Sequence, residues 1–177
     1  MQELLYNAFD IAYVIAYADM GAKKAAEFLN WIWQEEFVFL HEFYRDDKYK
    51  LVTDTYYWSD YLSDKTVIES EFPTIKKDLE STGNLSDSEL FCSDNFDVDL
   101  FFKLLRLRIL YVNEKKYVRM KLRTLLKEYG YKRRSDLLLQ YLRDRLMFYH
   151  IQTFVKGGII CDICDINLDE TIIFRVV

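Results

Sequence analysis

Apolar residues recur at helical spacing through the first part of the chain. Over residues 2–18 they fall three and four positions apart, and further apolar residues occupy the opposite side. A helix that is apolar all round is normally buried, and Gly21 is a suitable terminator for this one. A second apolar stripe, from Ala22 to about Tyr44, predicts a second helix.

The second predicted helix is rich in aromatic side chains that widen its apolar face. Aromatic stripes at helical spacing usually pack in a core, but tryptophan and tyrosine are also enriched at the centres of protein–protein interfaces. We therefore keep a partner-binding role open for this helix, with a second copy of the chain as one candidate partner. The residues concerned are Trp31, Trp33, Phe37 and Tyr44.

The middle of the chain has weaker patterns. Residues 50–62 are rich in β-branched and aromatic residues, which favours a strand over a helix. Short helices are predicted after Pro73 and after the capping box at residues 86–89. Because the sign of the charge changes just beyond residue 95, we divide the chain into an N-terminal helical region, 1–95, and a second domain, 96–177.

Three helices are predicted at the start of the second domain. They cover about residues 97–112, 116–129 and 135–150. Asn113 lies in the turn between the first two helices, and Ser135 is placed to cap the third. The helical period then gives way to three apolar runs that are typical of short strands.

The predicted strands cover residues 151–155, 159–166 and 171–176, and Gly157-Gly158 fits a hairpin turn. Three helices followed by a β-ribbon is the order of a winged helix-turn-helix. The sequence therefore predicts a mainly α (α+β) protein with an N-terminal helical part and a C-terminal winged helix.

Composition supports this class. Apolar residues make up 51% of the 177 residues and aromatic residues 17%, which excludes a disordered chain. The 5 glycines and 1 proline supply too few turns for a many-stranded sandwich or barrel.

The net charge of −5 hides a strong segregation. Residues 1–100 carry 8 lysines and arginines against 21 acidic residues, a charge of −13, whereas residues 101–150 carry 14 against 4, a charge of +10. Such a contrast favours either a polyanion-binding surface on the second part or two parts that attract each other.

The cations of the second domain suggest where nucleic acid would bind. Four of them, on the predicted helix 116–129, fall three, four and four positions apart, so we expect them on one face of that helix. Three more lie just before the predicted helix 135–150. A helix-turn-helix holds phosphates in this region, and Arg143 with Ser135 and Gln140 would contact bases. Asp136 and Asp144 oppose this, so we expect contact with the phosphate backbone of DNA or RNA. The candidate phosphate-binding residues are Lys116, Arg119, Arg123, Lys127, Lys132, Arg133 and Arg134.

One stretch resembles a known module. The run Leu122–Ser135, with Leu125-Leu126 followed by Gly130-Tyr131 and Arg133-Arg134, resembles the link between two helices in winged-helix modules of bacterial defence and restriction proteins. The resemblance covers the last 60–80 residues or so and implies a nucleic-acid-facing or assembly role. Winged helices also serve as protein-docking modules, so the fold alone does not set the function.

Catalytic patterns are weak. Asp97 or Asp99 with Glu114, Lys115 and Lys116 matches the spacing of metal-dependent nucleases only loosely, in a region where Glu–Lys pairs are common. Cys161 and Cys164 form a C-x-x-C in a β-prone run, where we expect two buried strand cysteines rather than a redox or zinc site.

We expect a cytoplasmic protein without cofactor, metal or catalytic residues. The chain starts without a basic, apolar leader, its longest apolar run is too short for a membrane span, and its 3 cysteines fit reduced thiols. The leading hypothesis is a non-enzymatic winged-helix protein that binds nucleic acid, a partner protein or both, as an accessory subunit or regulator of a bacterial nucleic-acid-handling or defence assembly.

Two alternatives stay open. The first is a phage-type inhibitor of a nucleic-acid enzyme, whose outward carboxylates would mimic nucleic acid. These carboxylates would be Asp46, Asp47, Asp54, Asp60 and Asp64. The second is a small metal-dependent nuclease built on Asp99, Glu114 and Lys116.

Overall fold

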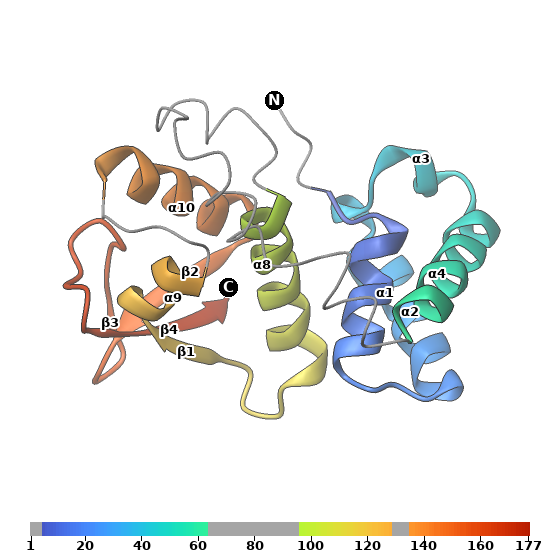
Figure 1. Cartoon of the computed structure of the whole chain (residues 1–177), viewed down its shortest axis with the longest axis horizontal. Coiled ribbons are helices and arrows are strands. Elements are labelled where there is room, and N and C mark those ends of the chain that lie inside the picture. Colours follow the sequence, from blue (N-terminus) through green and yellow to red (C-terminus); the bar gives the residue numbers. More distant parts are fainter. Residues whose placement is uncertain (1–4, 64–95, 129–134) are drawn as a thin grey trace. The chain divides into compact units, whose positions relative to one another are not determined.

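The computed structural model describes residues 5–63, 96–128 and 135–177 (Figure 1). The chain divides into two compact units, Met1–Pro73 and Thr74–Val177. The described residues are mainly helical and include one four-stranded antiparallel sheet, which confirms the mainly α class. The short helices predicted after Pro73 and at 86–89, and the boundary predicted at residue 95, fall in or beside 64–95, outside the described residues.

The N-terminal unit is helical. Its longest described helices are α1 (Ala8–Tyr17), α2 (Ala22–Glu35) and α4 (Lys48–Leu62), with a short α3 (Glu42–Arg45) before α4. Asn7 and Asp10 cap α1 reciprocally: the Asn7 side chain accepts from the Asp10 amide at 2.9 Å, and the Asn7 amide donates to the Asp10 carboxylate at 2.8 Å. Most of α1 is buried, as its apolar pattern predicts, and it packs against α4.

Two predictions for this unit are wrong. The second helix ends at Glu35 and not near Tyr44, because a 3-10 turn follows and Leu40 bridges to Tyr6 in a parallel pair. Residues 50–62, for which a strand was favoured, belong to α4. Its buried residues Leu51, Thr55 and Leu62 lie at helical spacing against α1, and such packing overrides the weak β preference of single residues.

The described residues of the C-terminal unit form both helices and strands. In chain order these are α8 (Phe96–Leu107), a π-helical turn (Arg108–Val112), β1 (Val118–Lys121), α9 (Leu122–Glu128), α10 (Asp136–Phe148), β2 (Ile151–Val155), β3 (Ile159–Ile160) and β4 (Thr171–Val176). Ser135 caps α10 as predicted, since its side chain accepts from the Leu138 amide at 3.2 Å.

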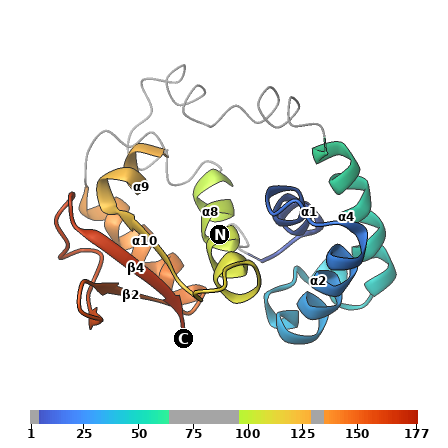
Figure 2. The ribbon, with the colours of Figure 1, turned by 90° about the horizontal axis from the view of Figure 1, so that it is seen from below.

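The sheet has the order β1-β4-β2-β3, with every neighbouring pair antiparallel. Gly157 and Gly158 both have positive φ and close the β2–β3 hairpin, which confirms the predicted turn. In Figure 2, α8, α9 and α10 lie to one side of β2 and β4. The fully buried Phe174 of β4 marks the covered face, and leucines of all three helices complete this core.

The helix predicted from Lys116 is also wrong in its first half. Lys116 has a φ of 53°, outside the helical region, and the next residues form strand β1 along the edge of β4. Val118 and Met120 are less exposed than Arg119 and Lys121, so burial alternates with the period of a strand. The helix begins only at Leu122. In the predicted strand 159–166, only Ile159–Ile160 pairs.

Candidate nucleic-acid interface

The strand register separates two faces of the sheet. Ile172 and Phe174 of β4 and Thr153 of β2 are buried on the side of the helices. Alternate residues therefore lie on the opposite face. We call this the outer sheet face; its residues are Arg119, Lys121, Gln152, Phe154, Ile160, Thr171, Ile173 and Arg175. Within the four strands this face carries three cations and no carboxylate.

The outer sheet face carries both cations and apolar side chains. One row of cross-strand neighbours runs through all four strands and consists of Arg119, Ile173, Phe154 and Ile160. In the next row Arg175 pairs with Gln152. The Arg175 guanidinium lies over two aromatic rings, 5.2 Å from the centroid of Phe154 and 5.9 Å from that of Tyr117. These contacts place a cation between two half-buried rings.

Several cations of this region are available to an external anion. Arg119, Lys121 and Lys156 are exposed, and within the described part of the chain none of them forms an ion pair or a side-chain hydrogen bond. Lys156 lies at the turn of the β2–β3 hairpin. Together with Arg175 they give the sheet and its hairpin four exposed positive charges.

Arg123 has an internal partner. It forms two hydrogen bonds with Asp169, from Nε at 2.8 Å and from Nη2 at 2.9 Å, at the surface. These bonds lower the pKa of the Asp169 carboxyl, and the charge of nearby Lys121 lowers that pKa further. The same partner raises the pKa of Arg123. A phosphate would have to compete with this carboxylate for the guanidinium.

The candidate cations do not form one helical stripe. Arg119 lies on β1, Arg123 on α9, and Lys116 in the turn before β1, where its Nζ donates to the Leu110 carbonyl at 2.8 Å. The expectation of a continuous face from Lys116 to Lys127 is therefore wrong, because a strand replaces half of that helix. Lys132, Arg133 and Arg134 lie outside the described residues.

Helix α10 offers little to a phosphate. Arg143 pairs with Asp162 at 3.4 Å, and Arg145 lies 3.5 Å from Asp99 and over the ring of Tyr141. The exposed residues of this helix include two carboxylates and several apolar side chains. They are Asp136, Leu137, Gln140, Asp144, Met147 and Phe148. The base-reading role expected for this helix therefore has little electrostatic support.

Asp99 is part of an internal network. The Tyr141 hydroxyl donates to its carboxylate at 2.7 Å, and burial together with this hydrogen bond raises the pKa of Tyr141. Asp99 is in the first turn of α8, whereas exposed Glu114 follows the π-helical turn. The two residues therefore lie at opposite ends of this helical segment, which rises by about 1.5 Å per residue in its α-helical part. The described residues contain no group of three His, Cys, Asp or Glu that could hold a metal ion.

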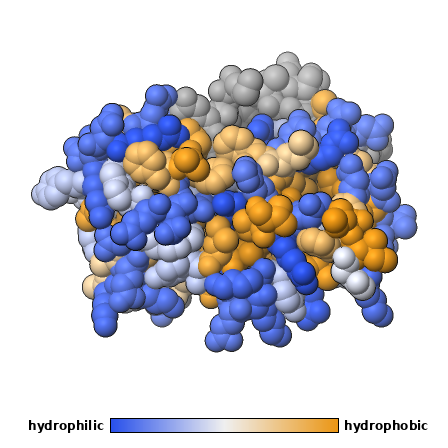
Figure 3. All heavy atoms as spheres, turned by 180° about the vertical axis from the view of Figure 1, so that it is seen from behind, coloured by the Kyte–Doolittle hydropathy of each residue, from blue (hydrophilic) through white to orange (hydrophobic). Residues whose placement is uncertain are grey.

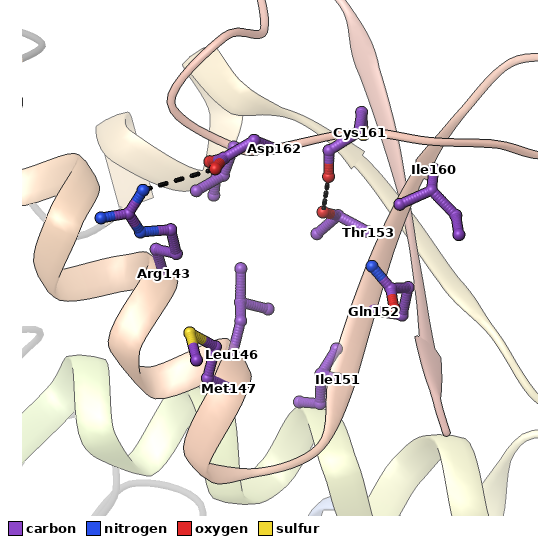
Figure 4. A pocket seen from close by; sticks show the side chains of 10 residues that line it. Arg143, Leu146, Met147, Ile151, Gln152, Thr153, Ile160, Cys161 and Asp162 are labelled. Carbon is purple, nitrogen blue, oxygen red and sulfur yellow. Dashed lines mark hydrogen bonds and ion pairs between the residues drawn. The ribbon is translucent and has the colours of Figure 1, made fainter.

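A small pocket lies between α10 and the sheet (Figure 4). Its volume is about 330 Å³, and Leu146, Ile151 and Ile163 contribute buried apolar side chains. The Arg143–Asp162 ion pair stands at one side, and the Thr153 hydroxyl donates to the Cys161 carbonyl at 2.6 Å. These polar groups are already paired with each other, so the pocket offers mainly apolar contact.

Cys161 and Cys164 are half-buried thiols. They follow β3 in a loop, so the expectation of two buried strand cysteines is wrong in both burial and secondary structure. Burial is the main cause that raises the pKa of both thiols, and for Cys164 the Asp162 carboxylate raises it further. A raised pKa keeps a thiol protonated and therefore less nucleophilic.

The partner-binding residues expected in the N-terminal unit have different surroundings. Trp31 and Trp33 are half-buried, whereas Phe37 is exposed and meets the ring of Trp33 edge to face at 5.3 Å. Tyr44 is buried, and its hydroxyl donates to Asp54 at 3.1 Å. Burial and this bond raise the pKa of Tyr44 to about 12. Tyr44 therefore packs inside the unit and is not exposed to a partner at the surface.

Both charged and apolar side chains reach the surface of the molecule (Figure 3). In the N-terminal unit the exposed aromatic residues include Phe43, Tyr49 and Tyr57. Of the carboxylates considered for nucleic-acid mimicry, Asp46, Asp47 and Asp60 are exposed. Asp54 is half-buried, and Asp64 lies outside the described residues.

Five residues of the outer sheet face and its surroundings are not predicted from the sequence: Tyr117, Lys121, Phe154, Lys156 and Arg175. A local signal was present, because Val118–Lys121 alternates apolar and basic residues with the period of a strand. The same residues also fit a helical stripe with Leu122 and Leu125, and that longer pattern predicts a helix.

Comparison with known proteins provides no further identification. Among the described helices, none has both the length and the apolar character needed to cross a membrane. No protein-family model matches the chain, and no curated protein or solved structure shows significant similarity to it.

Proposed function

We propose that the C-terminal unit is a winged-helix module that binds nucleic acid through its phosphates. The observation that carries this proposal is the outer sheet face, where Arg119, Lys121 and Arg175 lie together without a carboxylate. The order helix, strand, helix, helix and then the β2–β3 hairpin and β4 supports a winged helix, in which the hairpin is the wing.

The proposed contact surface differs from the usual one. A winged helix that reads duplex DNA places its third helix in the major groove. Here α10 presents Asp136 and Asp144 to solvent, and its Arg143 is paired with Asp162. Carboxylates repel phosphates, so the sheet and the hairpin are the better contact surface. Binding through phosphates implies little sequence preference and strong salt dependence.

The proposed role is to hold nucleic acid without chemical change, as an accessory subunit or regulator of a larger assembly. A nuclease built on Asp99 has little geometric support, because Asp99 accepts from Tyr141 far from Glu114. Winged helices also dock proteins, so a protein partner on another surface of the chain is compatible with this role.

A charge-reversal experiment on the full chain tests the proposal. The double variant Arg119→Glu/Lys121→Glu changes two exposed cations of β1, and Lys23→Glu/Lys24→Glu makes the same change on α2. Binding of labelled single-stranded and duplex oligonucleotides is measured by fluorescence anisotropy at low salt. We expect the β1 variant to weaken binding by about tenfold or more, since two phosphate contacts become repulsive.

The control is expected to bind nearly as the unchanged protein does. If neither form of nucleic acid binds to the unchanged chain, the proposal is wrong. If the two double variants lose affinity equally, general charge and not the outer sheet face is responsible, and the site assignment fails.

A further inference from the structure

We propose that the nucleic acid on the outer sheet face is single-stranded, with bases stacked on Phe154 and Tyr117. This inference rests on the proposed function and adds the class of ligand. It starts from the combination of aromatic and cationic side chains on one open sheet face, because a surface that only attracts phosphates needs no aromatic rings.

The shape of the surface is poorly suited to a duplex groove. The major groove of B-DNA is about 12 Å wide and admits a helix or a two-stranded ribbon. Four strands at about 4.8 Å separation span roughly 14 Å between the edge backbones alone. A duplex would therefore rest on the sheet through its phosphates, and Phe154, in the middle of the row, would meet no base.

The arrangement of rings and charges suits an unpaired strand. Phe154 lies on β2, and the row through it runs from Arg119 on one edge strand to Ile160 on the other. Lys156 follows at the hairpin turn. One cation, Arg119, thus lies at one end of the row, and a second, Lys156, lies two residues beyond Phe154 at the hairpin. An aromatic ring with cations on two sides matches a strand whose phosphates contact cations while its bases stack.

Arg175 connects the two aromatic positions. Its guanidinium lies within 6 Å of both ring centroids, at 5.2 Å from Phe154 and 5.9 Å from Tyr117. A guanidinium plane stacks on bases as well as on rings, so Arg175 can either cover a stacked base or contact the adjoining phosphate. Every base has a π-face, and this mode of binding therefore tolerates many sequences.

The test compares ligands and variants in the full chain. Dissociation constants are measured for a single-stranded oligodeoxynucleotide of mixed sequence, the matching oligoribonucleotide, and the duplex of the same length. Phe154→Leu removes the ring but keeps an apolar side chain, and Phe154→Tyr keeps the ring as a matched control. Tyr117→Leu repeats the test at the second ring. Circular dichroism establishes that each variant is folded.

We expect both single strands to bind more tightly than the duplex. Phe154→Leu should weaken single-strand binding by about fivefold or more, the lower range for loss of one stacking contact, while Phe154→Tyr stays close to the unchanged protein. Binding of the duplex should not respond to either change, because it involves phosphates alone.

The inference and the proposed function fail in different ways. If the duplex binds as well as the single strands and Phe154→Leu has no effect, the inference is wrong while phosphate binding stands. If poly-glutamate displaces a bound single strand as effectively as unlabelled nucleic acid does, the surface recognises anionic polymers in general, and the inference is again wrong. Absence of binding to all three nucleic acids overturns the proposed function itself.

Discussion

Asp99 joins helices α8 and α10 of the C-terminal unit, and its removal should destabilise that unit strongly. The carboxylate of this α8 residue accepts from the Tyr141 hydroxyl of α10 at 2.7 Å, and Arg145 lies 3.5 Å away. The Asp99 side chain is 8% exposed and that of Arg145 20% exposed, so water can replace little of this network. We consider Asp99→Ala, Asp99→Asn and Tyr141→Phe.

The expected losses follow from what each change leaves behind. Removing one member of a buried ion pair costs about 3–5 kcal/mol, and because Arg145 is partly exposed we take the lower value for Asp99→Ala. Asp99→Asn keeps an oxygen that can accept from Tyr141, so it should cost less than Asp99→Ala. Tyr141→Phe removes one hydrogen bond to a charged group, which contributes about 1.5–3 kcal/mol.

For a unit of about 100 residues, 1 kcal/mol shifts the melting temperature by roughly 4–8 °C. Asp99→Ala should therefore lower the melting temperature by at least about 12 °C. The 3 tryptophans, Trp31, Trp33 and Trp58, all lie in the N-terminal unit, so their fluorescence reports on that unit while far-ultraviolet circular dichroism reports on both. The exposed Asp144 provides a control, and Asp144→Ala should change stability by less than about 0.5 kcal/mol.

Two results would refute this reasoning. If Asp99→Ala costs no more than Asp144→Ala, the buried network does not stabilise the unit. If Asp99→Asn is as damaging as Asp99→Ala, the oxygen that accepts from Tyr141 makes no contribution of its own.

Further predictions concern binding and local stability. If Arg119, Lys121 and Arg175 each contact a phosphate, the logarithm of single-strand affinity should fall with the logarithm of salt concentration at a slope of about −2. The affinity would then decrease roughly 20-fold between about 50 and 200 mM salt. A slope near zero in an anisotropy titration would contradict phosphate contact. Ser135→Ala removes the cap of α10 and should lower the free energy of unfolding in urea by about 1 kcal/mol, whereas Ser135→Asp, which keeps an acceptor, should retain most of the stability; no loss on Ser135→Ala would show that the cap is dispensable. Gly158→Ala should cost about 1 kcal/mol in the same assay, because φ is +78°; Asn at this position should be better tolerated.

The elements that were predicted correctly have strong local signals. Ser135 marks the start of α10, Gly157-Gly158 marks a hairpin, and residues 171–176 form a strand with the predicted bounds. These features depend on interactions among near neighbours in the sequence.

The wrong predictions concern segments whose local signals conflict with packing. Residues 50–62 have a mixed β composition, yet three of them pack at helical spacing and α4 forms.

Strand β1 shows why the candidate surface could not be predicted in full. Val118 fits an apolar helical stripe that includes Leu122 and Leu125, and it also fits a strand. The choice depends on β4, more than 50 residues away, whose edge β1 covers through the pairs Val118–Phe174 to Lys121–Thr171. A single sequence does not show which distant segments pair with each other. Arg119 was named as a phosphate-binding residue for a helical face that does not form, and the pairing with β4 instead places it across from Ile173 on the outer sheet face.

The charge of +10 over residues 101–150 is a poor measure of the binding surface. Lys103 and Arg106 of that segment are buried, and Arg106 donates to the Tyr149 carbonyl. Arg123 and Arg143 are paired with carboxylates at the surface. Much of the positive charge therefore serves the fold.

Two cations of the proposed surface lie outside that segment altogether, Lys156 at the hairpin and Arg175 on β4. Residues 151–177 carry a net charge of −2 and would not be chosen on charge alone. Their carboxylates lie in the stretch 162–170, outside the four strands, and Asp162 and Asp169 are paired with Arg143 and Arg123. What makes a cationic surface here is the separation of unpaired cations from carboxylates by the strands, and net charge along the sequence does not measure that separation.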